Sequence, residues 1–247
     1  MRALLTAITC AKGDLQANLE VHVDLLARAA QAGCDLVVFP EFSLTGSVDP
    51  LRRPEHAIAI DDDAVHALTA ATGTHGPAAV FGFSERRGGE YFITQAVANG
   101  SRLVGVQRKR HLGEDEVQYS TGSDALVFEL CSRRLGIIIC AEGNVDWTWN
   151  ATVEAGAETV LFCSAPGLYG RRTDEASWRA GFEWWNAHGL GNAIRNAKRL
   201  RVRVAMATQA GTTVDEDFPG IAALVSAVGG VVDRLTDWYA GTLVVDL

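Results

Sequence analysis

Short apolar strand patterns alternate with amphipathic helical patterns along this chain, and that alternation constrains the fold more than any other feature. Residues 3–9 form a strand pattern, and residues 14–32 repeat apolar side chains at helical spacing. A second strand pattern over residues 35–40 must end at Pro40, because proline has no N–H to donate to a sheet. Strands separated by helices are typical of an α/β fold with parallel strands.

Glycine-containing turns add antiparallel pairs to this plan. Asn99-Gly100 joins the strand patterns of residues 91–98 and 103–109, which predicts a hairpin. Further strands are expected over residues 78–83, 125–130, 135–140, 159–163, 202–208, 222–227, 231–235 and 242–246, and further helices over residues 61–71, from the loop after Cys140 to about Gly156, and over 174–199. The sequence therefore predicts one α/β domain, residues 1–247, with mixed strand pairing.

Charge and hydropathy exclude two kinds of partner. The formal net charge is −8, so no overall positive field would attract nucleic acid. No apolar run approaches the roughly 18 residues of a membrane-spanning helix. The first apolar stretch turns polar at Lys12, too early for the core of a signal peptide, and this predicts a cytoplasmic location.

Several enzyme classes lack their motifs in this sequence. The six histidines show neither HxxxH nor HExxH spacing, so a zinc hydrolase has no support. A Walker motif and a G-x-S-x-G nucleophile elbow are both missing. We therefore expect no nucleotide enzyme and no serine hydrolase.

Three reactive side chains follow strand patterns, at the positions where α/β folds place ligands. Glu41 follows the strand that Pro40 ends, and Lys109 and Cys140 each close a strand pattern. Taken alone, Glu41 and Lys109 fit solvated surface residues, and Cys140 fits a core residue as well as an exposed thiol. Together, a carboxylate base, an ammonium and a thiol form a consistent set for acyl transfer.

These residues resemble the nitrilase superfamily of carbon-nitrogen hydrolases. The resemblance rests on Phe39-Pro40-Glu41, Lys109-Arg110-His111-Leu112 and Ile138-Ile139-Cys140, which occur in the family's order, and it extends to Leu44-Thr45-Gly46, Ser164-Ala165-Pro166 and Asp217-Phe218-Pro219-Gly220. It implies an α/β fold of the four-layer αββα sandwich type. It also implies that copies of the chain pair into a homodimer or a larger homo-oligomer.

The resemblance implies a role for each reactive side chain. Glu41 corresponds to the general base and Cys140 to the nucleophile that forms a covalent acyl-enzyme. Lys109 corresponds to the oxyanion donor, together with the backbone N–H of Ala141. No metal or organic cofactor enters such a scheme.

A second glutamate follows the lysine motif in many members of the family. Glu116, three residues before Tyr119, fits that pattern here, and Glu114 is the alternative because the loop is shortened. This glutamate would orient Lys109 or the substrate amide.

Substrate contacts are expected from four residues: Ala141, Glu142, Trp147 and Ser164. The segment after Cys140 departs from both amidase and nitrilase patterns, although Glu142 leans toward the nitrilase one. Other aromatic residues are candidates either to line the pocket or to pack in the core or at an interface, namely Trp149, Tyr169, Trp178, Trp184 and Trp185.

The leading functional hypothesis is a thiol-dependent hydrolase that cleaves a non-peptide C–N bond of a small amide or carbamoyl compound and releases ammonia. Three alternatives stay open from the sequence. They are hydrolysis of a small nitrile, acyl transfer from the same cysteine to an amine, and a non-catalytic member that acts as a binding subunit.

Overall fold

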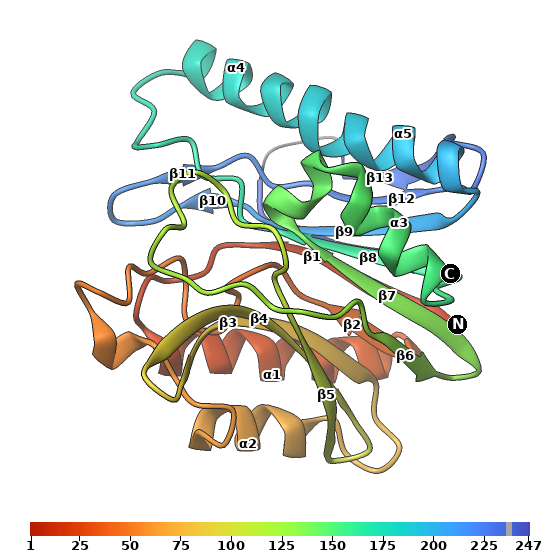
Figure 1. The fold of residues 1–247 in the computed structure, drawn as a ribbon, viewed down its shortest axis with the longest axis horizontal. Coiled ribbons are helices and arrows are strands. Elements are labelled where there is room, and N and C mark those ends of the chain that lie inside the picture. Colours follow the sequence, from red (N-terminus) through yellow and green to blue (C-terminus); the bar gives the residue numbers. More distant parts are fainter. Residues whose placement is uncertain (236–238) are drawn as a thin grey trace.

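The computed structural model describes residues 1–235 and 239–247, and within them twelve strands join one sheet that folds back into two facing halves (Figure 1). The first half runs in the order β14 (Gly241–Asp246), β1 (Arg2–Ile8), β2 (Leu36–Val38), β3 (Ala78–Arg87), β4 (Glu90–Asn99) and β5 (Arg102–Arg108). The second half runs in the order β13 (Val231–Arg234), β12 (Ala222–Val225), β9 (Arg203–Gln209), β8 (Thr159–Ser164), β7 (Arg133–Ile139) and β6 (Val127–Leu130). The halves are joined where the end of β1 pairs with β9.

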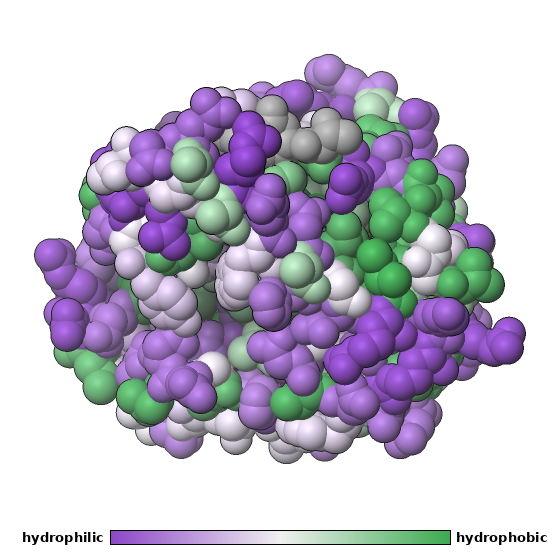
Figure 2. Space-filling view, turned by 90° about the horizontal axis from the view of Figure 1, so that it is seen from above, coloured by the Kyte–Doolittle hydropathy of each residue, from purple (hydrophilic) through white to green (hydrophobic). Residues whose placement is uncertain are grey.

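Helices cover the outer face of each half (Figure 1). The first half carries α1 (Leu15–Gln31) and α2 (Asp63–Ala71), and the second carries α3 (Asp146–Glu154), α4 (Glu175–Trp185) and α5 (Gly191–Leu200). Shorter elements are the 3-10 turns η1 (Pro54–His56) and η2 (Cys140–Asn144), the π-helical turn η3 (Asn186–Leu190), and a small pair of strands, β10 (Gly211–Thr212) and β11 (Asp217–Phe218). Figure 2 looks onto the α4 and α5 side, where hydrophilic residues cover most of the surface.

Successive side chains of a strand point to opposite faces of the sheet, and this alternation explains the order of the layers. In β1, Ala3, Leu5 and Ala7 pack between the two halves of the sheet, whereas Leu4 and Ile8 join the core beneath α1 and α2. This is the pattern of a strand that is buried on both faces.

The second half repeats the arrangement. In β7, Ile137 and Ile139 face the other half of the sheet, and Ile138 joins the core beneath the helices with Trp149 of α3 and Ala193 of α5. The order of layers is thus helix, sheet, sheet, helix. The predicted four-layer αββα sandwich is confirmed.

Aspartates set the starts of three helices. The side chains of Asp14, Asp62 and Asp174 accept hydrogen bonds from the first-turn N–H groups of α1, α2 and α4. Each bond satisfies an N–H that has no partner inside its helix. Most of the predicted strands and helices lie within one or two residues of the observed bounds.

The predicted helix over residues 174–199 differs in detail. The chain passes from α4 into α5 through the π-helical turn η3, which contains Gly189, so the helical segment is continuous but not α-helical throughout. A Cβ at Gly189 would lie 2.5 Å from the ring of Trp185, so only glycine lets that ring pack against the turn. The pair β10 and β11 was not predicted, because two-residue strands have no periodicity to detect.

No helix among residues 1–235 and 239–247 is long and apolar enough to cross a membrane.

Candidate active site

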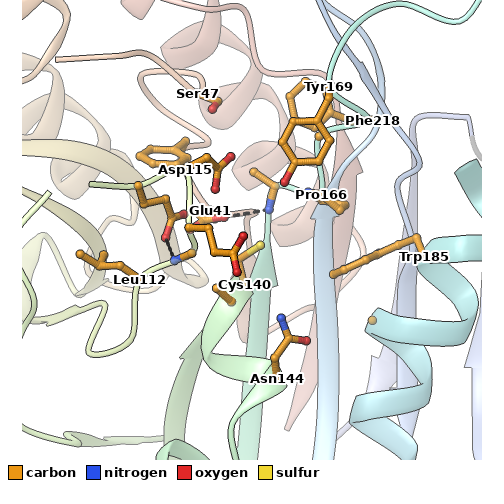
Figure 3. A pocket seen from close by; sticks show the side chains of 18 of the residues that line it. Glu41, Ser47, Leu112, Asp115, Cys140, Asn144, Pro166, Tyr169, Trp185 and Phe218 are labelled. Atoms are coloured by element: carbon orange, nitrogen blue, oxygen red, sulfur yellow. Dashed lines mark hydrogen bonds between the residues drawn. The ribbon is translucent and has the colours of Figure 1, made fainter. Parts of the chain in front are cut away.

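Glu41 and Cys140 lie at the same end of the sandwich, although they are far apart in the sequence (Figure 3). Lys109 joins them through its 2.7 Å contact with Glu41. Glu41 follows β2 and Lys109 follows β5, both in the first half of the sheet, while Cys140 follows β7 in the second. The face-to-face packing of the two halves therefore brings a carboxylate, an ammonium and a thiol to one place.

The Lys109 side chain is fully buried between two carboxylates. Its Nζ lies 2.7 Å from Oε1 of Glu41 and 2.5 Å from Oε1 of Glu116. Burial by itself lowers the pKa of Lys109, but the charges of Glu41 and Glu116 outweigh it and hold the pKa above its ordinary value. Lys109 is therefore a fixed cation at neutral pH.

Glu41 is held by contacts on both oxygens and is almost completely buried. Oε1 binds Lys109, and Oε2 accepts a hydrogen bond of 3.0 Å from the backbone N–H of Ala165. Burial raises the pKa of Glu41 to about 7. The positive charge of Lys109 opposes this increase, and the negative charge of Glu116 adds to it. A carboxylate with this pKa can both take and return a proton near neutral pH.

Cys140 occupies a strained turn. Its φ is +41°, in the left-handed region that costs a non-glycine residue about 1–2 kcal/mol. Burial and the Glu41 charge raise the pKa of the Cys140 thiol well above its usual value, while Lys109 lowers it. The thiol therefore stays protonated until a base accepts its proton, and Glu41, which lines the same cavity, is the candidate base.

The two candidates for the second glutamate differ in placement. Glu116 contacts Lys109, and its Oε2 accepts a hydrogen bond of 2.6 Å from the backbone N–H of Gly113. Glu114 lies on the exposed rim and lines the cavity without contacting Lys109. The geometry favours Glu116 for the role of orienting the lysine.

A cavity of about 620 Å³ opens in front of Cys140 (Figure 3). Aromatic rings form much of its wall, from Phe42, Tyr119, Phe162, Tyr169, Trp184, Trp185 and Phe218. Its mouth carries further carboxylates, those of Glu114, Asp115 and Glu216. No lysine or arginine among the described residues lines it, but the Lys109 ammonium contacts the lining carboxylates of Glu41 and Glu116. The excess negative charge therefore lies at the rim of the cavity.

One of the four residues predicted to bind substrate lies at the cavity. Ala141 lines it, directly after Cys140. Trp147 is half exposed on α3, where its ring centre lies 5.9 Å from the guanidinium of Arg110 instead. Ser164 is completely buried at the end of β8, and its neighbour Ala165 supplies the cavity contact.

Glu142 also departs from its predicted place. It is completely buried, and Arg110 and the backbone N–H of Ile139 occupy its two carboxylate oxygens. The side chain lies behind the nucleophile turn, outside the cavity lining. Glu142, Trp147 and Ser164 therefore lie outside the cavity lining, and their substrate contacts stay a prediction.

Several cavity residues were not identified from the sequence. The turn η3 and its flanks contribute Trp184, Trp185, His188, Gly189 and Asn192. The two tryptophans were candidates from the sequence. His188, Gly189 and Asn192 were not, because a π turn is rare and leaves no pattern of its own.

The described residues contain no group of three or more His, Cys, Asp or Glu side chains that could hold a metal ion.

The chain matches a known family and several curated proteins. The family model described as carbon-nitrogen hydrolase matches residues 4–247. The chain is 34% identical to an aliphatic nitrilase from Rhodococcus rhodochrous over 148 residues, 52% of this chain and 40% of that protein. It is 26% identical to an (R)-stereoselective amidase from Pseudomonas sp. over 162 residues, 65% of this chain and 59% of that protein. The chain thus spans only about half the length of these curated relatives.

Solved structures agree with this match. An amidase from Nesterenkonia sp. AN1, with the acetamide moiety of fluoroacetamide added covalently at its active-site cysteine, superposes with a TM-score of 0.82 at 25% identity. That match covers 100% of this chain and 90% of the other. A glutamine-dependent NAD+ synthetase from Acinetobacter baumannii shares the fold, with a TM-score of 0.80 at 18% identity over 98% of this chain and 44% of that one. The family match over residues 4–247, together with these structures, shows that the chain belongs to the carbon-nitrogen hydrolase family.

Proposed function

We propose that this protein is a thiol-dependent hydrolase that cleaves the C–N bond of a small amide or carbamoyl compound through a Cys140 acyl-enzyme and releases ammonia. The observation that carries the proposal is the buried contact of Lys109 with Glu41 and Glu116 beside a strained cysteine at a cavity. Membership of the carbon-nitrogen hydrolase family supports the same reaction class.

In the first half of the proposed reaction, Glu41 accepts the thiol proton as Cys140 sulfur attacks the substrate carbonyl carbon. The carbonyl oxygen gains negative charge, which the Lys109 ammonium and the backbone N–H of Ala141 stabilise. Glu116 holds Lys109 in place through the 2.5 Å contact. The C–N bond then breaks, Glu41 returns its proton to the leaving amine, and a thioester remains on Cys140.

In the second half, water replaces the amine. Glu41, ionised again, takes a proton from the water as its oxygen attacks the thioester carbon. The same donors stabilise the second oxyanion, and collapse of this intermediate breaks the C–S bond. The thiol regains its proton from Glu41, so one amide and one water yield one carboxylic acid and one ammonia. The pKa of about 7 suits Glu41 to both directions of transfer.

Nitrile hydrolysis is the second candidate. The specific observation in its favour is the 34% identity to an aliphatic nitrilase, the highest value among the relatives described above. A nitrile would consume two waters to reach the same acid and ammonia. The thiol attack and the acyl-enzyme would be shared, so the two activities differ in the first adduct and not in the residues that form it.

Assembly and location are part of the proposal as well. We expect a homodimer or larger homo-oligomer in the cytoplasm, with a small amide or nitrile as substrate and no metal or cofactor. Light scattering on the purified protein measures the assembly directly, and a single monomer mass would contradict it.

Ammonia release tests the proposed function. The purified protein is incubated with short aliphatic amides, carbamoyl compounds and the matching nitriles, and ammonia and acid are both measured. The variant Cys140→Ala is the control, because it removes the nucleophile and leaves the cavity walls in place. Turnover by the wild type that Cys140→Ala loses supports the proposal. Turnover that survives in Cys140→Ala, or no turnover of any of these substrates, contradicts it.

A further inference from the structure

A buried ion pair connects the Lys109 segment to the turn that carries Cys140. Oε1 of Glu142 accepts hydrogen bonds from the backbone N–H of Arg110, at 2.8 Å, and from its guanidinium Nε, at 2.9 Å. Oε2 of Glu142 accepts a hydrogen bond of 2.7 Å from the backbone N–H of Ile139. One carboxylate therefore binds both the residue after Lys109 and the residue before Cys140.

Helix α3 anchors this pair from behind. Nη2 of Arg110 donates to Oγ1 of Thr152 at 3.0 Å, and Oγ1 of Thr148 donates to the carbonyl oxygen of Glu142 at 2.6 Å. Both members of the pair are buried, with 5% of Arg110 exposed and none of Glu142. The carboxylate has no freedom to move without leaving a buried charge or N–H unpaired.

The turn that this carboxylate fixes is the strained one. Cys140 adopts a φ of +41°, and such a conformation persists only when the surrounding structure holds it. The bond from Ile139 to Glu142 closes the turn around Cys140, because the carboxylate reaches back from two residues after the cysteine to one residue before it. The same carboxylate fixes the backbone that leads into the Lys109 side chain.

Glu142 and Arg110 lie outside the cavity lining, and the contacts of the Glu142 carboxylate are with Arg110 and the backbone of Ile139. We propose that Glu142 is a positioning residue, whose single carboxylate sets the separation between the Lys109 ammonium and the Cys140 thiol. A buried ion pair adds little net stability compared with apolar packing. The main effect of the Glu142–Arg110 pair is therefore to hold the Lys109 segment and the Cys140 turn in a fixed relative position. The inference rests on the proposed function, because it assigns the two segments to one reaction.

Two substitutions of Glu142 test the link. Glu142→Gln keeps the volume, but its amide has a donor at one end, so either Arg110 or Ile139 loses an acceptor. Glu142→Asp keeps the charge but is one methylene too short to reach both partners. We expect kcat and the rate of Cys140 alkylation by iodoacetamide to fall about 10²-fold, the effect of a misplacement of about 1 Å, with KM near the wild-type value.

Glu85 of β3 offers a matched control, because its partner Arg108 ends β5 next to Lys109. Glu85 is equally buried and accepts hydrogen bonds from Nη2 and Nε of Arg108, at 2.6 and 2.7 Å, and from Oγ1 of Thr94. Arg108 directly precedes Lys109, but Glu85 makes no contact with the Cys140 turn. Glu85→Gln should therefore lower the Tm as much as Glu142→Gln does, yet keep kcat and the alkylation rate near wild type.

The outcomes separate positioning from stability. Three outcomes would each overturn the proposal. The Glu85 and Glu142 variants could lose kcat and alkylation rate equally, or a folded Glu142 variant could keep both rates unchanged. Both Glu142 variants could also fail to fold. A wild type that is alkylated at Cys140 but turns over no amide or nitrile would refute the proposed function alone, and the alkylation rates would still decide on Glu142. A wild type without selective alkylation of Cys140 would refute both.

Discussion

Burial of Glu41 predicts a specific pH dependence of catalysis. Its pKa is raised from the ordinary value of 4.5 to about 7, chiefly because the carboxylate is removed from water. The ionised form is the proposed base for Cys140, so kcat/KM should fall as the pH drops through about 7. A solvated glutamate would stay ionised down to about pH 4.5 and would give a flat profile above that value.

The size of the effect follows from the shifted pKa. A base with a pKa of about 7 is roughly 10% ionised at pH 6 and roughly 90% ionised at pH 8, so kcat/KM should rise about tenfold between those values. The alkylation rate of Cys140 should rise by a similar factor, because it needs the same proton acceptor. Lys109 stays charged throughout, since the pKa of its ammonium is raised further by Glu41 and Glu116.

The assay is the initial rate of ammonia release from a small neutral amide, at substrate levels below KM and constant ionic strength. Such an amide does not titrate in this range, so the profile reports the free enzyme. Glu41→Gln is the control and should lose both the titration and about 10²–10⁴-fold of the rate. A flat wild-type profile from about pH 6 to 8, or a fully active Glu41→Gln protein, would refute the reasoning.

Three further predictions follow from the site. Lys109→Met removes the proposed oxyanion donor and should lower kcat by at least about 10²–10³-fold. It should also lower the Tm, because Glu41 and Glu116 lose the cation that pairs with them. Because the exposed carboxylates of Glu114 and Asp115 line the cavity, an amide that carries a carboxylate should show a higher KM than its neutral isostere. Added salt should reduce this difference in KM. Gly143→Ala would place a Cβ 2.6 Å from the ring of Phe162, so the free energy of unfolding, measured by denaturant titration, should fall by about 1–3 kcal/mol.

The main strands and helices were predictable from the sequence, because their burial leaves a periodic pattern. The inner strands β2 and β8 are buried along their whole length, and β7 is buried from Leu135 to Ile139. The cavity wall was harder to predict. The turn η3 depends on how the Trp185 ring packs against Gly189, which is a tertiary contact and leaves no periodicity.

The positions of the reactive groups were also predictable, since Glu41, Lys109 and Cys140 each follow a strand. The direction of the side chains after Cys140 could not be predicted from the sequence. The left-handed conformation of Cys140 turns the chain back on itself, so Glu142 points behind β7 and binds Ile139 instead of entering the cavity. The sequence gives the order of residues but does not show that the backbone changes direction at Cys140.

The most direct test of the central claim, that Glu41 activates Cys140, is brief alkylation with limiting iodoacetamide followed by peptide mapping. Cys131 is an internal reference, because it is exposed while Cys140 is only partly accessible and the other three cysteines are buried. We predict that the label appears first on Cys140 and that Glu41→Gln abolishes this preference. Label that appears first on Cys131, or label on Cys140 that is unaffected by Glu41→Gln, would contradict the account.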